Sequence, residues 1–280
     1  MKVKVKAEAK EILLALSVIA LTLPVIFSGV LALKTNFAGD VGQKSAAITN
    51  IKKFCSTGQF FYGLGDYAYS TSVGSAADSA WKTCQSKRGV QGNHECVKSQ
   101  SEEWAAATFG FSNCNQSSKS AINSNVAFVG INQYESYKVG SLQYSRVTTN
   151  LAKYNNMSNI DWIVVAYHEP GKGLGCGGSH CHGDNTNFYS IYEPIFKKYL
   201  PKILIVDAHT HLTGVGKINN VRTIQCGASG EGGTTLGSLH GFVYGSSKTG
   251  YCNVDFQHDK AIMRHISSSG QILHTHIFNK

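Results

Sequence analysis

Side chains of the types that bind metal ions recur in five short segments of the sequence. Each segment places a carboxylate, amide or imidazole group just after a predicted strand or a glycine turn. The segments are Gly39-Asp40-Val41-Gly42, Gly65-Asp66-Tyr67-Ala68-Tyr69, Gly92-Asn93-His94-Glu95, Tyr167-His168-Glu169 and His209-Thr210-His211. One such segment alone indicates a turn, but five in series indicate side chains that converge on a crevice at the ends of strands. The chemistry indicated is that of a metal centre built from oxygen and nitrogen donors.

Apolar runs directly before three of these segments predict the strands that position them. Residues 60–64 lead to Asp66, residues 163–166 to His168, and residues 203–206 to His209. Runs this short and this apolar are typical of strands buried on both faces. Residues 34–38 and 126–131 predict further strands, and the alternation over residues 271–278 predicts a C-terminal strand that is antiparallel to its neighbour,.

The stretches between the runs carry apolar residues at helical spacing, so the chain is predicted to be mixed α/β. The predicted helices span residues 46–55, 141–154 and 188–199. Residues 112–124 and 229–238 are rich in Gly, Ser and Asn and are expected to form loops,. Because no repeat or boundary is visible after residue 33, residues 33–280 are predicted to form one catalytic domain.

The order of the five segments resembles that of the calcineurin-like metallophosphoesterases, and Tyr69 points to their purple acid phosphatase branch. The resemblance covers about residues 37–212 and is weaker in the terminal strands. It implies a four-layer sandwich in which two mixed β-sheets are flanked by helices. It also implies a ferric ion held by Asp40, Asp66, Tyr69 and His211, and a divalent iron, zinc or manganese ion held by Asp66, Asn93, His168 and His209.

The donor types suit such a pair of ions. A carboxylate shared between two cations, the role that the resemblance gives to Asp66, offsets their mutual repulsion. The phenolate of Tyr69 is an anionic oxygen donor suited to a hard trivalent ion, whereas neutral amide and imidazole donors suit a divalent ion.

Two positions depart from the family pattern. Many members outside the purple branch have Asp-x-His in the first segment, but Gly42 stands at the third position here, and Tyr69 supplies the missing ligand. A glycine commonly precedes the last His-x-His pair, where this chain has Ala208. The extra methyl group is expected to shift that loop slightly without removing a ligand.

The resemblance implies a hydrolase of phosphate esters, of the acid phosphatase type, in which a metal-bound hydroxide attacks phosphorus. Asn93 and His94 would contact the phosphate, and His94 would act as general acid for the leaving oxygen. His180 and His182 are candidates for a further contact with the substrate. A phosphodiesterase or nucleotidase on the same site, and a surface binding protein without turnover, stay open as alternatives.

Carboxylates beside proposed site residues form a further group of candidates. Glu95 and Glu169 are expected to orient ligands by hydrogen bonds. Histidines near the C-terminus are expected on the surface or in packing roles, namely His240, His258, His265, His274 and His276.

The N-terminal segment predicts export. Residues 12–33 form an uncharged apolar run that is interrupted only by Pro24 and is preceded by four Lys and two Glu. A run of this length is a signal peptide or a membrane anchor within residues 1–32. Almost no linker separates the run from Asp40, which favours cleavage over a retained helix. The protein is therefore expected to be secreted or displayed at the cell surface, with membrane attachment as the alternative.

Composition excludes several other classes of protein. The net charge of +9 comes from scattered Lys and Arg without aromatic interleaving, so no nucleic-acid-binding face is indicated,. The expected partner is a small phosphate ester. A Gly-x-Ser-x-Gly elbow and a Gly-rich phosphate loop ending in Lys-Ser or Lys-Thr are both missing from the sequence, which argues against a serine hydrolase or that type of nucleotide triphosphatase,.

The eight cysteines all lie beyond the apolar run. An even number of cysteines in an exported chain predicts disulfides. Cys176 and Cys181 bracket a short loop and are predicted to pair with each other. A zinc site made of Cys176, His180, Cys181 and His182 is the competing hypothesis.

Overall fold

Two mixed β-sheets lie face to face in the computed structural model, which describes residues 32–280 except 58, 112, 115–118 and 180. The predicted signal peptide or anchor lies outside the described residues, apart from Ala32 at its end. In the part of the chain that is described, no helix is long and apolar enough to cross a membrane. The prediction for residues 1–32 therefore stays a prediction.

The first sheet follows the strand order β15-β14-β13-β1-β2-β3. Neighbours among β1, β2 and β3 are parallel, whereas β13, β14 and β15 are antiparallel to their neighbours. The strands are β1 (Leu33–Ala38), β2 (Phe60–Gly63), β3 (Lys87–Gly89), β13 (Gly250–Phe256), β14 (Lys260–Ser267) and β15 (Ile272–Asn279).

The second sheet follows the order β12-β9-β10-β8-β6-β5-β4, and its central strands β5, β6, β8 and β10 are parallel. The strands are β4 (Ala121–Asn123), β5 (Val126–Gly130), β6 (Trp162–Ala166), β8 (Ile203–Asp207), β9 (Thr213–Ile218), β10 (Val221–Cys226) and β12 (Phe242–Ser246). A small ladder pairs β7 (Gly175–Gly178) with β11 (Thr234–Ser238).

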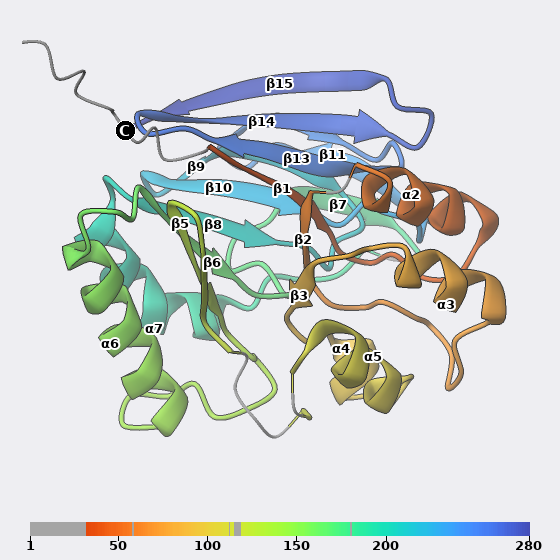
Figure 1. Cartoon of the computed structure of the whole chain (residues 1–280), viewed down its shortest axis with the longest axis horizontal. Coiled ribbons are helices and arrows are strands. Elements are labelled where there is room, and N and C mark those ends of the chain that lie inside the picture. Colours follow the sequence, from red (N-terminus) through yellow and green to blue (C-terminus); the bar gives the residue numbers. More distant parts are fainter. Residues whose placement is uncertain (1–31, 58, 112, 115–118, 180) are drawn as a thin grey trace, which may run out of the picture. The chain divides into compact units, whose positions relative to one another are not determined.

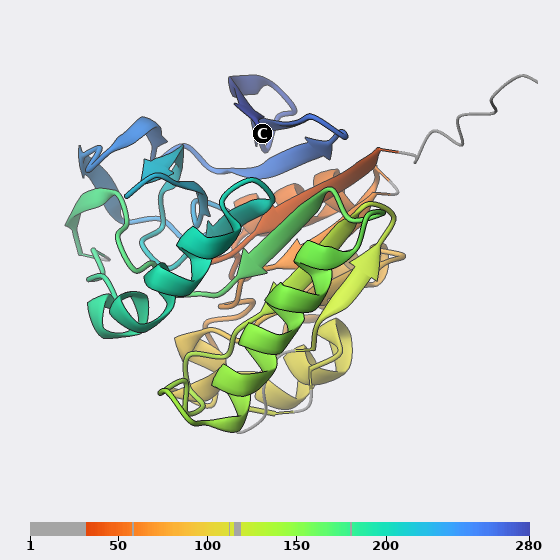
Figure 2. The same cartoon turned by 90° about the vertical axis from the view of Figure 1, so that its left-hand side faces the viewer.

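Helices cover the outer face of each sheet (Figures 1 and 2). The first sheet is covered by α2 (Ser45–Cys55), α3 (Ser75–Lys82) and α5 (Glu102–Phe109), with the short α4 (Asn93–Cys96) nearby, and the second by α6 (Leu142–Asn156) and α7 (Thr186–Phe196). Helix α6 begins where the Ser141 hydroxyl accepts the Tyr144 N–H, and a 3₁₀ turn (Lys197–Tyr199) extends α7. The layers are helix, sheet, sheet and helix, which confirms the predicted sandwich.

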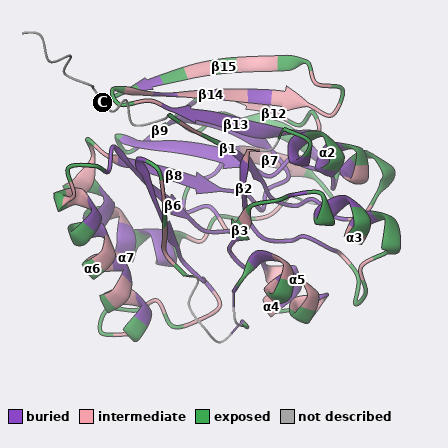
Figure 3. Ribbon diagram, in the orientation of Figure 1, coloured by how far each residue is buried: buried purple, intermediate pink, exposed green. Residues whose placement is uncertain are grey.

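Three apolar clusters hold the four layers together, one at each interface between layers. Side chains alternate between the two faces of a strand, so Phe128 and Val164 point to the first sheet while Val129 and Val165 pack beneath α6 and α7,. Strands β5, β6 and β8 are buried along their whole length, as Figure 3 shows in purple. Because both faces are covered, the sequence of these strands is continuously apolar rather than alternating.

Most of the predicted elements are confirmed within one or two residues, including the antiparallel C-terminal strand. Helix α7 begins two residues before the predicted start, because the Asn185 side chain accepts the N–H of Phe188. Both predicted loops are wrong in part, since residues 112–124 contain β4 and residues 229–238 contain β11. These strands are partly exposed and are held by main-chain pairing, so they lack the apolar pattern that identifies a buried strand,.

Every cysteine is described and is paired. The disulfides are Cys55–Cys84, Cys96–Cys114, Cys176–Cys181 and Cys226–Cys252. The predicted pair is confirmed, and the competing zinc site is wrong because a disulfide sulfur is not a thiolate ligand. The last of these bonds joins β10 to β13 and so links the two sheets. Four disulfides are typical of proteins outside a reducing cytoplasm.

The disulfide between the sheets is expected to contribute more stability than the one in the loop after β7. It closes a chain segment of 26 residues, against 5 for Cys176–Cys181, and both of its cysteines are fully buried. Chain entropy alone gives about 3.5 kcal/mol for the longer loop and about 2 kcal/mol for the shorter one. We expect Cys226→Ala with Cys252→Ala to lower the free energy of unfolding more than Cys176→Ala with Cys181→Ala in denaturant titrations. Equal losses would contradict this ranking.

Candidate metal centre

The proposed metal ligands lie in the segments that follow β1, β2, β3, β6 and β8, and one of them, Asn93, is the first residue of α4. β1, β2 and β3 are parallel to one another in the first sheet, as are β6 and β8 in the second, so each group of strands ends at one edge of its sheet. Main-chain hydrogen bonds then join the loops: the Asp40 N–H donates to Gly65 O at 3.2 Å and the Ala208 N–H donates to His168 O at 2.9 Å. The sandwich therefore brings five separate segments of the sequence to one place.

Four of the proposed ligands have a backbone conformation that non-glycine residues rarely adopt. The φ angles are 53° at Asp40, 56° at Asp66, 68° at His209 and 55° at His211. Left-handed backbone costs roughly 1 kcal/mol or more for a residue with a side chain, and it clusters at functional sites. The surrounding loops hold this strain, and it turns the four side chains toward one centre.

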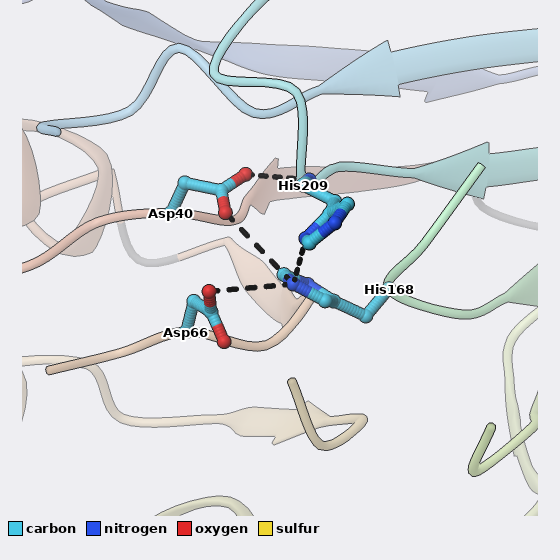
Figure 4. Close-up of side chains that lie close together, drawn as sticks. All are labelled: Asp40, Asp66, His168 and His209. Carbon is cyan, nitrogen blue, oxygen red and sulfur yellow. Dashed lines mark hydrogen bonds and ion pairs between the residues drawn. The ribbon is translucent and has the colours of Figure 1, made fainter. Parts of the chain in front are cut away.

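Asp40, Asp66, His168 and His209 form the centre of the site (Figure 4). Each offers one ligand atom, and these atoms all lie within 4.8 Å of one another. Nε2 of His168 lies 3.4 Å from Asp66 Oδ2, 4.0 Å from Asp40 Oδ1 and 3.0 Å from His209 Nδ1. The side chains of Asp40, Asp66 and His168 are almost completely buried.

Hydrogen bonds to main-chain carbonyls fix the tautomers of two histidines. Nδ1 of His168 donates to Leu64 O at 2.7 Å, and Nδ1 of His211 donates to Gly232 O at 3.3 Å. A neutral imidazole that donates through Nδ1 presents the lone pair of Nε2, which is the atom a metal ion binds. Both Nε2 atoms face the cluster of carboxylates.

The electrostatics of the cluster favour a positive charge at its centre. Burial raises the pKa of Asp40 well above its ordinary value, in spite of the opposing effect of His168. Burial alone would lower the pKa of His168, but the Asp66 and Asp40 carboxylates raise it to about 10. In the absence of another cation, the buried carboxylates thus favour a proton on the His168 ring between them. Oxygen and imidazole donors around such a point fit a metal ion.

Tyr69, His211 and Asn93 extend the cluster on two sides. The Tyr69 hydroxyl lies 3.2 Å from Asp40 Oδ1 and 3.1 Å from His211 Nε2. On the other side, Asn93 Oδ1 lies 3.1 Å from His168 Nε2. The structure therefore brings together the side chains of all the ligands proposed from the sequence.

Glu95 holds the loops that carry Asp66 and Asn93. Its Oε2 accepts the N–H groups of Asp66 at 2.9 Å and Gly92 at 2.8 Å, and its Oε1 accepts the N–H of Tyr67 at 2.9 Å. Burial and the neighbouring Asp66 charge raise the pKa of Glu95 to about 7. The expectation that Glu95 orients the site by hydrogen bonds agrees with these contacts.

Glu169 makes a different set of contacts. It accepts hydrogen bonds from the Tyr134 hydroxyl at 3.0 Å and from Asn185 Nδ2 at 2.8 Å, so it ties the loop after β6 to the start of α7. Gln133, which no sequence pattern singles out, accepts the N–H of His168 at 3.1 Å. An isolated glutamine in a loop carries no local pattern that would identify it.

His94 lies beside the cluster rather than in it. Its N–H donates to Asp66 Oδ1 at 2.9 Å, and its Nε2 lies 3.8 Å from Asp66 Oδ2. The ring packs on Tyr69 with 3.9 Å between ring centroids. His94 is therefore placed at the edge of the site.

Of the two histidines proposed as further substrate contacts, the structure describes one. The ring centroid of His182 lies 4.6 Å from that of His209 and 5.5 Å from that of His211, so His182 is at the site. His180 lies outside the described residues. Of the C-terminal histidines, His265 is fully buried and its Nδ1 forms a hydrogen bond of 2.9 Å with the Tyr244 hydroxyl, which is a packing role as expected.

The alanine that replaces the usual glycine before His209 is accommodated by Gly39. A Cβ atom added to Gly39 would lie 2.4 Å from Cβ of Ala208, a distance that side chains do not tolerate. The methyl group of Ala208 therefore occupies the space that a side chain at position 39 would need, and the glycine at position 39 leaves that space free. This is why Ala208 is compatible with the ligand positions on both sides.

No family model and no curated protein sequence matches the chain. Solved structures do match it. A purple acid phosphatase isolated from yellow lupin (Lupinus luteus) seeds gives a TM-score of 0.69 at 14% identity, covering 89% of this chain and 54% of that chain. GAP50, the anchor in the inner membrane complex of Plasmodium, gives 0.63 at 16% identity over 89% of each chain. A dimetal phosphatase from Danio rerio gives 0.56 at 10% identity, covering 90% of this chain and 99% of that one.

These similarities define the fold. This chain has the sandwich fold of these structures, which confirms the fold that the resemblance to the calcineurin-like metallophosphoesterases implies. It spans about half the length of the lupin enzyme. Two of the three structures are phosphatases and one is an anchor, so the fold alone does not decide the activity.

The three hydrogen bonds accepted by Glu95 give a prediction about stability. In Glu95→Gln one side-chain oxygen becomes an NH₂ group, which faces main-chain N–H groups that then lose their acceptor. We expect the free energy of unfolding of the metal-free protein to fall by about 2 kcal/mol, since each buried group left unpaired costs about 1–3 kcal/mol. Glu103→Gln on the exposed surface of α5 is the matched control and should stay within about 0.5 kcal/mol,. Similar unfolding curves for both variants would remove Glu95 from this role.

Proposed function

We propose that this chain is an exported, binuclear metal-dependent hydrolase of phosphate esters, of the acid phosphatase type. The observation that carries the proposal is the convergence of seven metal-binding side chains from five loops at one edge of the sandwich. The fold is shared with phosphatases, which supports the same class of reaction.

The arrangement of donors supports two unlike metal sites. Asp40, Tyr69 and His211 lie on one side, where carboxylate and phenolate oxygens suit a ferric ion,. Asn93, His168 and His209 lie on the other side, where neutral donors suit divalent iron, zinc or manganese. Asp66 would serve both ions.

When bound, the two cations would activate a water molecule and neutralise the charge that develops on phosphorus. The chain's own residues would bind the phosphate and donate the proton. His94, at the edge of the cluster, would contact the phosphate and give a proton to the leaving oxygen, and Asn93 and His182 would hold the phosphate from the other directions. His180, which stands between Cys176 and Cys181 in the sequence, is proposed as a further contact.

A second candidate function is that of a binding or anchoring protein on the same fold. The match to GAP50, an anchor, over 89% of each chain favours it. The buried donor set of this chain supports a bound metal in either case, because two buried carboxylates are unfavourable for stability unless a cation accompanies them,. A phosphodiesterase or nucleotidase would use the same ligands, and a panel of substrates separates these activities.

We also propose that the protein is secreted or displayed at the cell surface. The four disulfides support export, and the apolar segment within residues 1–32 supports a signal peptide or an anchor. Mass analysis of the exported protein's N-terminus distinguishes these two possibilities.

The proposed ferric site gives a visible colour through charge transfer from Tyr69. The oxidised, metal-loaded protein is expected to be pink to violet, and Tyr69→Phe is expected to lose the colour because the donor oxygen is gone. Tyr67→Phe is the matched control, because Tyr67 is two positions before Tyr69 in the sequence and is not a proposed ligand. Its hydroxyl donates to Val90 O at 2.8 Å. Metal quantification with visible spectra checks the expectation. A colourless wild type with stoichiometric ferric iron would remove Tyr69 from the metal shell.

Turnover of a generic aryl phosphate tests the role of His94. We expect His94→Ala to keep both metals and the colour while kcat falls about 10²-fold or more, as is usual on losing a positioned acid or charge donor. His258→Ala changes an exposed histidine that pairs with Asp161 and should retain normal turnover. Normal kcat in His94→Ala, with metals in place, would exclude a catalytic role for His94.

A further inference from the structure

The segment that follows α4 turns back over His94. The N–H groups of Val97 and Lys98 donate to Asn93 O at 2.8 and 3.1 Å, and the Gln100 N–H donates to His94 O at 2.8 Å. The segment is held at both ends. Cys96 is bonded to Cys114, and the Ser101 hydroxyl donates to Ser70 O, beside Tyr69, at 2.7 Å.

Two strained residues flank Gln100 within this segment. Ser99 has a φ of 52° and Ser101 a φ of 57°, both in the left-handed region. Neither is a glycine, so each conformation is unfavourable by about 1 kcal/mol or more and persists only where other contacts require it. The consequence of the double turn is that the side chain of Gln100 meets the ring of His94.

Hydrogen bonds on both ring nitrogens define the state of His94. Gln100 Oε1 lies 2.5 Å from Nδ1, and Lys98 Nζ lies 3.2 Å from Nε2. An ammonium group can only donate, so Nε2 has to accept. A neutral ring then carries its proton on Nδ1, which donates to Gln100 Oε1. The three side chains form one chain of hydrogen bonds in the order Gln100, His94, Lys98.

This chain of hydrogen bonds places the Lys98 ammonium beside the metal cluster. His94 Nε2, which Lys98 contacts, lies 3.8 Å from Asp66 Oδ2. Among the described residues, no carboxylate lies within 4.0 Å of Lys98 Nζ, so its charge has no ion-pair partner there. Of the three N–H groups on the ammonium, one is used by His94.

We propose that Lys98 contacts the substrate's phosphate and that Gln100 is a positioning residue, which orients the His94 ring with Nε2 toward Lys98 in the site before substrate binds. The inference rests on the proposed function and deepens it. Two N–H groups of the Lys98 ammonium are left after its hydrogen bond to His94. An anionic phosphate oxygen is a charge-assisted acceptor for them.

Binding of inorganic phosphate to the metal-loaded protein, measured by calorimetry, tests this proposal without turnover. We expect Lys98→Gln to raise Kd about tenfold and Lys98→Arg to raise it less. Gln100→Leu should raise Kd several-fold, and Gln100→Glu, whose carboxylate also accepts the Nδ1 proton, should restore most of the affinity. Because both residues act through one chain of hydrogen bonds, the double variant Lys98→Gln with Gln100→Leu should bind phosphate with the same Kd as Lys98→Gln alone.

Lys153→Gln on the exposed face of α6 is the matched control and should leave Kd unchanged. A wild-type Kd in Lys98→Gln would overturn the contact with phosphate. Additive effects of Lys98→Gln and Gln100→Leu would overturn the positioning role.

The tautomer of His94 gives a second readout that needs neither metal nor activity. In ¹⁵N NMR of the metal-free protein we expect the ring proton on Nδ1 in the wild type and in Gln100→Glu, with a shift toward Nε2 in Gln100→Leu. The same tautomer in Gln100→Leu and the wild type would overturn the role of Gln100. A wild type that binds phosphate but hydrolyses no ester would contradict the proposed function alone, while both tests of this inference would still stand.

Discussion

Two buried carboxylates, Asp40 and Asp66, are the constraint on which the rest of the site depends. Charged groups out of contact with water are strongly unfavourable unless a cation accompanies them, and here the nearest groups are imidazoles and a phenol,. In the protein alone the carboxylates raise the pKa of His168 to about 10. The negative potential that keeps a proton on the imidazole also attracts a metal ion to the lone pair that the imidazole has when it is neutral. The electrostatics and the donor types therefore both indicate a metal site.

Holding this cluster requires a rigid scaffold. The strands that lead into the site belong to two different sheets, and an apolar core packs the sheets against each other. Glu95 and Gln133 then fix the loops through main-chain N–H groups, and left-handed backbone at four ligand positions turns the side chains inward. Strain of this kind persists because the sandwich supplies enough burial to offset it.

The solved structures that share this fold include phosphatases and an anchor. The sandwich supplies the edge at which loops converge, and the residues in those loops decide what happens there. In this chain the loops combine a set of metal donors with His94 and, through the turn after α4, with Lys98 and Gln100. The short segment that carries Lys98 and Gln100 is anchored by the disulfide at Cys96.

The sequence by itself determined the strands β2, β5, β6 and β8, the helices α2, α6 and α7, and the ligand candidates, because burial on both faces and helical periodicity leave strong local patterns,. It also determined the pairing of Cys176 with Cys181, since the two residues are so close in the chain. Strands β4 and β11 were not predictable in this way, because they are held by main-chain hydrogen bonds that are independent of side-chain type. Only the tertiary structure decided the tautomer of His168, the close packing of Ala208 on Gly39, and the contact of Gln100 with His94. These depend on which atoms meet across separate segments, and no local pattern of residues encodes such a meeting.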